Sequence, residues 1–252
     1  MAHEYRSEGY KILKGAGLEI GALHQPAQLP QECKVEYADV ISREDAIKLF
    51  PEVNKNLFVD VTHLVNLDKR GFSSFENERF DFVILNHVIE HLANPIKALS
   101  ELFRVVKEKG YVVIGCPDKE FTFDKKRKLT SFDHLLQEYK ENVSEVSDEH
   151  YIDFMEAVHP EVIGNIEHFL TALKSFRERR EHAHVWNSES FQHFLEQSMK
   201  HLNIVAECKF VHTSIDNEYE HFSIWEKKKY IVEEEKSRDK FLNFFKNIFF
   251  QR

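Results

Sequence analysis

Two histidines and one glutamate lie close together in the segment NHVIEH. His87, Glu90 and His91 have the spacing i, i+3 and i+4, so a helical turn would point all three side chains in one direction. The imidazole of histidine takes up a proton near neutral pH, because its ordinary pKa is about 6.5. We therefore predict a general base at this turn, with His87 and His91 as the candidates. An alternative stays open, in which Glu90 and His91 only hold the turn in place through hydrogen bonds.

The turn follows a buried strand and precedes a helix. Residues 80–85 form a nearly continuous apolar run, which is typical of a parallel strand buried on both faces. Pro95 suits a helix start, and apolar residues recur after it at three- and four-residue spacing. Gly110 is expected just past the helix end, before a second apolar run at residues 111–116. Since ligands bind beyond the carboxyl ends of parallel strands, the turn lies where a ligand is expected.

Three earlier segments predict strands, at residues 18–22, 35–41 and 57–63. The connection after the first of them contains two prolines, so no regular helix is expected there. Ser42 and Asp45 form a capping-box-like start for a short helix between the second and third strands.

The remainder of the chain predicts a change of architecture. Residues 119–186 read as a mostly helical insertion that covers the substrate, and another helix runs to about His201. Residues 204–213 and 221–226 then predict a closing antiparallel hairpin. The sequence therefore predicts an α/β fold in one domain over residues 1–228: a Rossmann-like, mostly parallel seven-stranded sheet with an antiparallel terminal hairpin.

A nucleotide-like cofactor needs a close approach of the backbone and an acid that holds its ribose hydroxyls. The segment GLEIGA supplies Gly21 at the turn after the first strand, and Asp39 ends the second strand 18 residues later. Leu23 and Gln25 stand where a fully glycine-rich loop has further glycines. The loop alone predicts a nucleotide site only weakly, because a glycine can also simply close a strand.

Taken with the NHVIEH turn, this arrangement resembles the class I S-adenosylmethionine-dependent methyltransferases, particularly those with a V-x-E-H turn after the fourth strand. The resemblance covers roughly residues 15–118. It implies S-adenosylmethionine as the cofactor, held by Glu19, Gly21, Ala22 and Asp39. Relatives of this type often methylate bacterial surface glycans and small molecules. The expected activity is methyl transfer to a hydroxyl or amine of a sugar-containing or other small polar acceptor.

The adenine of such a cofactor requires a polar partner and an apolar wall. The loop NLDKRGFSSF offers Asp68 as the partner and Phe72 or Phe75 as the wall. Asn86, at the end of the fourth strand, would lie beside the methionyl part of the cofactor. Asp68 could equally be a solvated residue in a turn.

A divalent metal ion is the alternative role for the NHVIEH turn. Some members of the resembled family read E-x-x-E-H there and bind such an ion, whereas the first acid is His87 in this chain. Two imidazoles and a carboxylate suit a transition metal better than Mg²⁺. His134, His182 or His184 could complete the shell. Our main prediction is a base without a metal.

Two segments outside the core could contact the acceptor. In the first, Asp118, Arg127 and His134 could hydrogen-bond a polyhydroxylated molecule. In the second, HAHVW, His184 could join them and Trp186 could stack on a sugar face. The alternative for each segment is an ordinary solvated helix or core aromatic.

Composition limits the partners and the setting. The net charge of −9 argues against nucleic acid as the main partner, because phosphate binding relies on clustered Lys and Arg. The three cysteines have no paired metal spacing, and no stretch has the length of a signal peptide core or a membrane span. We expect a cytoplasmic protein.

The C-terminal tail, residues 229–252, has a different composition. Phe241, Phe244, Phe245 and Ile248 would share one face of a helix, beside an excess of basic residues. An amphipathic helix of this kind suits peripheral contact with a membrane or a partner protein. It could instead dock on the protein's own core.

Two further function classes stay open. A nicotinamide-dependent oxidoreductase also uses one glycine and a later acid on a related sheet. A catalytically silent, methyltransferase-like scaffold would explain the missing loop glycines. The NHVIEH turn and the closing hairpin favour the methyltransferase.

Overall fold

A computed structural model describes residues 4–229 of the chain. Its centre is a seven-stranded sheet in the order β3-β2-β1-β4-β5-β7-β6. Neighbouring strands from β3 through β5 run parallel, whereas β7 pairs antiparallel with both β5 and β6. The strands are β1 (Gly15–Ile20), β2 (Cys33–Asp39), β3 (His63–Leu64), β4 (Phe80–Asn86), β5 (Val106–Pro117), β6 (Ala206–His212) and β7 (Glu220–Lys227).

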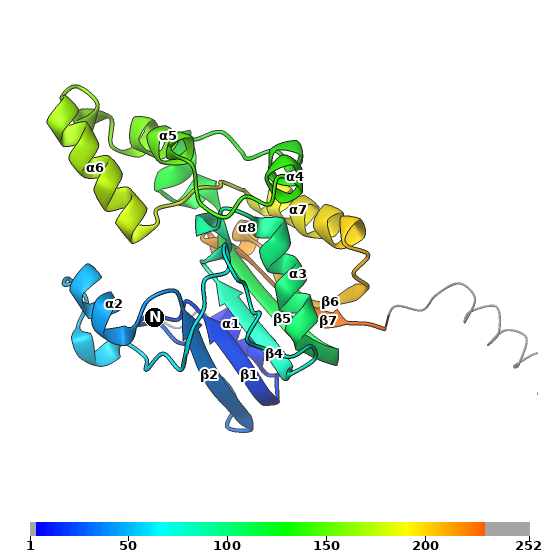
Figure 1. Cartoon of the computed structure of the whole chain (residues 1–252). Coiled ribbons are helices and arrows are strands. Elements are labelled where there is room, and N and C mark those ends of the chain that lie inside the picture. The colour runs from blue at the N-terminus through cyan, green and yellow to red at the C-terminus, as the bar shows by residue number, and fades with distance from the viewer. Residues whose placement is uncertain (1–3, 230–252) are drawn as a thin grey trace, which may run out of the picture.

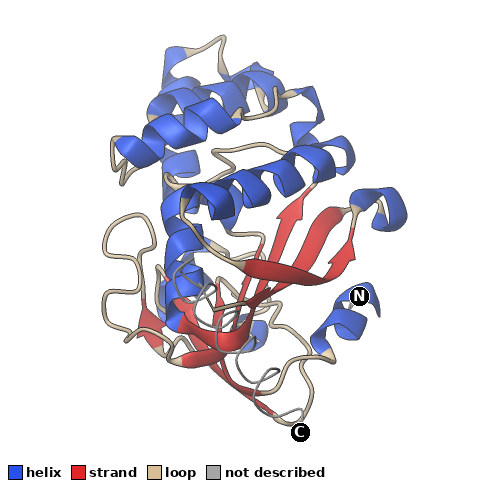
Figure 2. Cartoon of the chain, turned by 90° about the vertical axis from the view of Figure 1, so that its right-hand side faces the viewer, coloured by secondary structure: helices blue, strands red, loops and turns tan. Residues whose placement is uncertain are grey.

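The helices fall into two groups, those outside the insertion of residues 119–186 and those within it. The first group comprises α1 (Glu4–Tyr10), α2 (Arg43–Leu49), α3 (Pro95–Val105), α7 (Ser188–His201) and the short α8 (Ser214–Asn217). The insertion contains α4 (Phe132–Lys140), α5 (Asp148–Val158) and α6 (Ile166–Arg179). Figure 1 shows α4, α5 and α6 gathered at one end of the sheet, and Figure 2 shows the strands lying below this helical group.

The central strands bury side chains on both faces, as their apolar runs predict. In β4, Phe82 and Ile84 pack with Tyr10 of α1 on one face. Val83 and Leu85 belong to the larger core on the other face, which α3 and α7 cover. Both faces of β4 are therefore covered by packed side chains. A ligand can approach this strand only at its carboxyl end, where the NHVIEH turn lies.

The predicted fold class is confirmed, including the antiparallel terminal hairpin and the helical insertion after β5. The first crossover has no helix, and Ser42 caps α2 by accepting from the Asp45 amide. The sequence prediction places two boundaries incorrectly. The third strand has only two residues, His63–Leu64, and the predicted segment begins at the end of a 3₁₀ turn, residues 55–57. α3 ends at Val105, and Gly110 lies inside β5 rather than at a helix end.

No helix within residues 4–229 is long and apolar enough to cross a membrane. The predicted amphipathic helix of the C-terminal tail lies outside the described residues.

Candidate functional site

A cavity of about 400 Å³ lies at the carboxyl ends of β1, β2 and β4. The sheet supplies one side of it, and residues 178–182, from the end of α6 onward, supply another. The lining residues are Ile20, Gly21, Leu23, Asp39, Val40, Ile41, Leu49, Phe50, Val65, Leu67, His87, Val88, His91, Leu92, Phe123 and 178–182. Its position is the one where open parallel sheets bind ligands, and its size suits a small organic cofactor.

Gly21 forms the floor of the cavity beside the turn after β4. Its φ of +70° lies in the left-handed region, and a Cβ on it would come within 2.4 Å of Val88 Cγ2. Only glycine fits both conditions. The chain therefore needs a glycine here even though Leu23 and Gln25 follow.

The other predicted residues of the cofactor loop have distinct places. Glu19 is buried and accepts the amide of Ala27 at 3.0 Å, so it holds the loop rather than lining the cavity. Burial raises the pKa of Glu19 to about 7. Ala22 is buried next to the loop, and Asp39 lines the cavity with its carboxylate accepting the Ile41 amide. Burial also raises the pKa of Asp39 above its ordinary range.

The predicted adenine contacts are corrected by the structure. Asp68 is buried, accepts the Ala93 amide at 2.8 Å and pairs with Arg180, so its carboxylate is committed to the fold. Phe75 packs edge-on against Phe80 in the core and does not line the cavity. Hydrophobic lining comes instead from Val40, Ile41, Val65 and Leu67, which follow β2 and β3.

Asn86 lies at the predicted strand end but outside the cavity lining. Its amide donates to the hydroxyl of Tyr10 at 2.9 Å, across the sheet from α3. The residue therefore ties α1 to the end of β4.

His87 lines the cavity in a left-handed conformation, with φ of +54°. Its Nε2 lies 2.8 Å from Oε2 of Glu220, a fully buried carboxylate at the start of β7. A carboxylate only accepts, so Nε2 carries the proton and Nδ1 of a neutral ring keeps its lone pair. Glu220 also accepts from Arg6, and these hydrogen bonds outweigh burial and lower its pKa to about 2.

Glu90, His91 and His182 form a second group at the same cavity, with donor atoms all within 4.8 Å of one another. Glu90 and His91 belong to a 3₁₀ turn, and only His91 of the two lines the cavity. The Nδ1 of His91 donates to the carbonyl of Arg180, which leaves its Nε2 lone pair 3.7 Å from Glu90. Both carboxylate oxygens of Glu90 are buried and make no hydrogen bond within the described residues. The three side chains could orient an acceptor or bind a metal ion.

Burial dominates the ionisation of this group. It raises the pKa of Glu90 and lowers that of His91 well below its ordinary value. Burial also disfavours protonation of His182, but its hydrogen bond with Asp124 and the charge of Glu90 raise its pKa overall. His91 is therefore a neutral and weak base, and His182 is the ring more easily protonated.

Three residues that were predicted to contact the methyl acceptor instead make contacts within the fold. Asp118 is buried and accepts from Ser188 and Ser214. Arg127 is buried and donates to Asp124, to Asp153 and to two carbonyls of the HAHVW segment. Trp186 is 2% exposed and belongs to the main core, so it cannot stack on a sugar.

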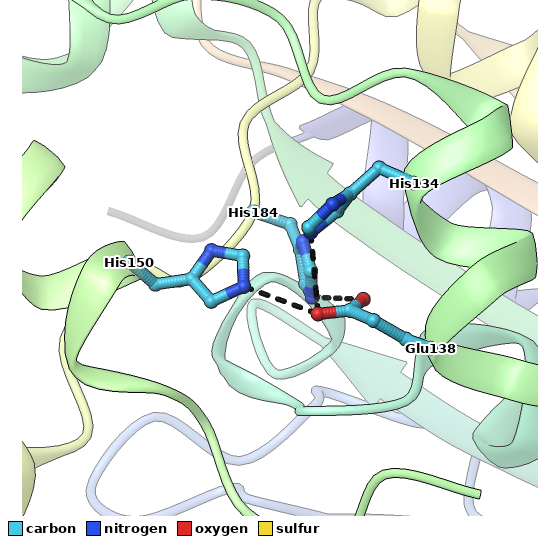
Figure 3. A group of neighbouring side chains, drawn as sticks. All are labelled: His134, Glu138, His150 and His184. Atoms are coloured by element: carbon cyan, nitrogen blue, oxygen red, sulfur yellow. Dashed lines mark hydrogen bonds and ion pairs between the residues drawn. The ribbon is translucent and has the colours of Figure 1, made fainter. Parts of the chain in front are cut away.

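His134 and His184 do come together, although away from the lining of the cofactor cavity. They meet Glu138 and His150, two residues that the sequence prediction did not include. His134 and Glu138 share a face of α4, His150 lies on α5, and His184 lies in the extended segment before α7 (Figure 3).

Two residues of the cofactor cavity site were also not predicted from the sequence. Glu220 starts β7, the second strand of the closing hairpin, far along the chain from His87. Arg180 adopts a left-handed conformation at the end of α6, with φ of +54°. No sequence pattern points to either residue, because both act through contacts with segments far away in the chain.

A family comparison supports the methyltransferase among the predicted function classes. The profile of the methyltransferase domain family matches residues 19–198, which include the cavity loop, the NHVIEH turn and the insertion. The chain belongs to this family. This methyltransferase therefore uses S-adenosylmethionine as its methyl donor, as the resemblance implied.

Comparison with individual proteins supports the fold but does not identify the methyl acceptor. Uncharacterized protein MJ1123 of Methanocaldococcus jannaschii is 30% identical over 109 residues, 43% of this methyltransferase and 48% of that protein, so the match spans about half of the relative. A Rhodobacter sphaeroides structure assigned to the Zn-dependent alcohol dehydrogenases shares 14% identity over 90% of each chain, with a TM-score of 0.52. A SAM-dependent methyltransferase of Thermotoga maritima, described as a possible histamine N-methyltransferase, shares 18% identity over 90% of this chain and 88% of its own, with a TM-score of 0.44. At these identities the structural likeness concerns the fold alone.

Proposed function

We propose that this methyltransferase acts on a hydroxyl or amine of a small polar acceptor, with His87 as the general base. The observation that carries the proposal is the pairing of His87 with Glu220 at the wall of the cofactor cavity. A buried carboxylate that holds one ring nitrogen fixes the tautomer and stabilises the imidazolium that forms when the other nitrogen takes a proton.

The residues around the cavity fit the cofactor. Gly21 lets the backbone come close, Asp39 offers a carboxylate for ribose hydroxyls, and Val65 and Leu67 offer an apolar wall for adenine. When bound, S-adenosylmethionine supplies an electrophilic methyl group on a sulfonium. The chain then has to align the acceptor and remove its proton as the new bond to oxygen or nitrogen forms.

The end of the insertion supplies the acceptor side. Glu178, Arg179, Glu181 and His182 line the cavity together with Phe123. These charged and aromatic groups favour a polar acceptor, sugars included. Since Asp118, Arg127 and Trp186 are committed to the fold, recognition of a glycan would rest on these cavity residues.

The proposal is tested by replacing His87. His87→Ala should slow methyl transfer by roughly 10²- to 10⁴-fold, as expected for loss of a general base, and leave affinity for S-adenosylhomocysteine nearly unchanged. The rate is measured as S-adenosylhomocysteine formation with a panel of sugars, alcohols and amines. His193→Ala, an exposed histidine on α7, is the matched control. A wild-type rate in His87→Ala would exclude His87 as the base.

The cluster of Glu90, His91 and His182 supports a second version, in which a metal ion at this cluster assists the reaction. Glu90→Gln should then abolish both metal binding there and activity. If His87→Ala stays active while Glu90→Gln is inactive, the metal version replaces the base version.

A further inference from the structure

We propose that His134, Glu138, His150 and His184 form a four-ligand site for a zinc-type divalent metal ion within the insertion. The four side chains come from α4, α5 and the extended segment before α7, and Figure 3 shows them converging on one point. Their donor atoms all lie within 4.8 Å of one another. This site is separate from the cluster of Glu90, His91 and His182 and from the lining of the cofactor cavity.

The separations match those between ligands of one ion. The Nε2 atoms of His150 and His134 lie 3.1 and 3.2 Å from Oε1 of Glu138, and Nε2 of His184 lies 3.5 Å from Oε2. Zinc bonds of about 2.0–2.1 Å in a tetrahedron place neighbouring donor atoms roughly 3.4 Å apart. The ring nitrogens and carboxylate oxygens therefore already have nearly the required spacing.

Two buried ligand atoms of this group make no hydrogen bond within the described residues. Nδ1 of His150 lies 3.0 Å from the carbonyl of Ala183, which only accepts, so Nδ1 carries a proton and Nε2, 3.1 Å from Oε1 of Glu138, is the nitrogen that can bind a metal ion. Nε2 of His184 and Oε2 of Glu138 are buried, and neither makes a hydrogen bond within residues 4–229. Buried polar atoms without a partner are costly. One divalent cation would satisfy the three imidazoles and the carboxylate together.

The ligand set indicates the class of metal. Three imidazoles and one carboxylate suit zinc and related transition metals, whereas Mg²⁺ and Ca²⁺ prefer oxygen ligands. Four protein ligands leave no open position, which is typical of a structural site. The hydrogen bond from His150 to Ala183 is the kind of outer contact that orients a metal-binding histidine.

The site has both an entrance and a connection to the reaction centre. His134 is exposed, and it lines with His150 a second cavity of about 330 Å³ that opens to solvent. The amides of Ala183 and His184 donate to the backbone carbonyl of Glu90, at 2.8 and 3.0 Å. A metal ion bound at His184 would therefore fix the segment that brings His182 to the cofactor cavity.

The test measures metal binding without using activity. The full chain is stripped with a chelator, and its affinity for Zn²⁺ is measured by competition with a chromophoric chelator. Wild type should bind zinc at this site, and Co²⁺ in its place should give the intense visible absorption of a four-coordinate ion. His134→Ala and Glu138→Gln should each weaken zinc binding at least about tenfold and remove the cobalt spectrum.

The controls are His91→Ala, in the other cluster, and His193→Ala, on the surface of α7. Both should keep the wild-type zinc affinity and cobalt spectrum at this site. The proposal is overturned if His134→Ala binds zinc as tightly as wild type, or if the four-coordinate cobalt spectrum disappears in His91→Ala instead. Because His134 is exposed, its replacement keeps the test valid even if Glu138→Gln fails to fold.

Discussion

Glu220 is a buried carboxylate that connects α1, near the start of the described chain, to His87, the proposed general base. It accepts from Tyr5 and Arg6 of α1 and from His87 of the turn after β4. These partners hold its pKa near 2, although burial alone would raise it. A carboxyl group whose pKa is lower in the folded state stabilises the protein above its ordinary pKa of 4.5 and loses this contribution as the pH falls toward 2.

Glu220→Gln should therefore destabilise the protein most at neutral pH. A depression from 4.5 to about 2 corresponds to roughly 3 kcal/mol at pH 7. The stability difference from wild type, measured by urea unfolding, should shrink by roughly 2 kcal/mol between about pH 5 and about pH 3. A difference that does not change over this range would show that Glu220 is not ionised with a depressed pKa.

Asp39 lines the cavity and is the proposed ligand of the cofactor's ribose. Asp39→Ala should weaken S-adenosylhomocysteine binding by roughly 1–3 kcal/mol, because ribose hydroxyls would lose charge-assisted hydrogen bonds. Calorimetric titration measures the change, and Asp60→Ala, an exposed acid outside the cavity, serves as control. Equal affinity in the two variants would exclude Asp39 as the ribose ligand.

At this scale the sequence predicted the residues near the strand ends better than the rest. Gly21, Asp39, His87 and His91 all line the cavity, because the carboxyl ends of parallel strands meet there. Roles were harder to predict for residues of the insertion, because a helical or alternating pattern does not show which face packs against the rest of the protein. Trp186, predicted either to stack on a sugar or to be a core aromatic, lies in the core. The partners Glu220 and Glu138 depend on tertiary contacts that the sequence pattern does not contain.

At the scale of elements, two turns meet where β1 and β4 end side by side. Gly21 follows β1 and Val88 follows β4, and the contact between them leaves no room for a side chain at position 21. The cofactor cavity thus depends on the fit of one turn against the other.

Gly21→Ala should lower S-adenosylhomocysteine affinity at least tenfold and stability by about 1–2 kcal/mol, because alanine is strained at this φ and its Cβ meets Val88. Affinity is measured calorimetrically and stability by thermal unfolding. Adding Val88→Ala should recover part of the loss by removing the contact while the strain remains. Wild-type affinity in Gly21→Ala would show that this turn does not set the cavity.

Most elements followed from apolar periodicity and caps, such as α3 from Pro95 and α2 from Ser42. The exception, β3, has two residues that pair with the end of β2. Its residues sit at the edge of the sheet, where burial is weak and the apolar pattern gives little information. The parallel neighbours of β4 gave stronger signals because both their faces are buried.

At the scale of the whole molecule, the insertion closes over the sheet through charged contacts. Arg180 pairs with the buried Asp68, and Arg179 pairs with Glu52 and stacks over Phe50 near α2. These contacts join the end of α6 to segments that come before β4 in the chain. Residues 178–182 thus line the same cavity as Gly21 and Asp39. The cavity therefore forms only when both the sheet and the insertion are in place (Figure 1).

The central claim is that this cavity binds S-adenosylmethionine and supports methyl transfer. The most direct measurement is calorimetric titration of the full chain with S-adenosylhomocysteine and with NAD in parallel. The account predicts one saturable site for S-adenosylhomocysteine, filled in competition with S-adenosylmethionine, and no binding of NAD. Binding of NAD alone would indicate an oxidoreductase, and binding of neither would indicate a scaffold, so either result would contradict the account.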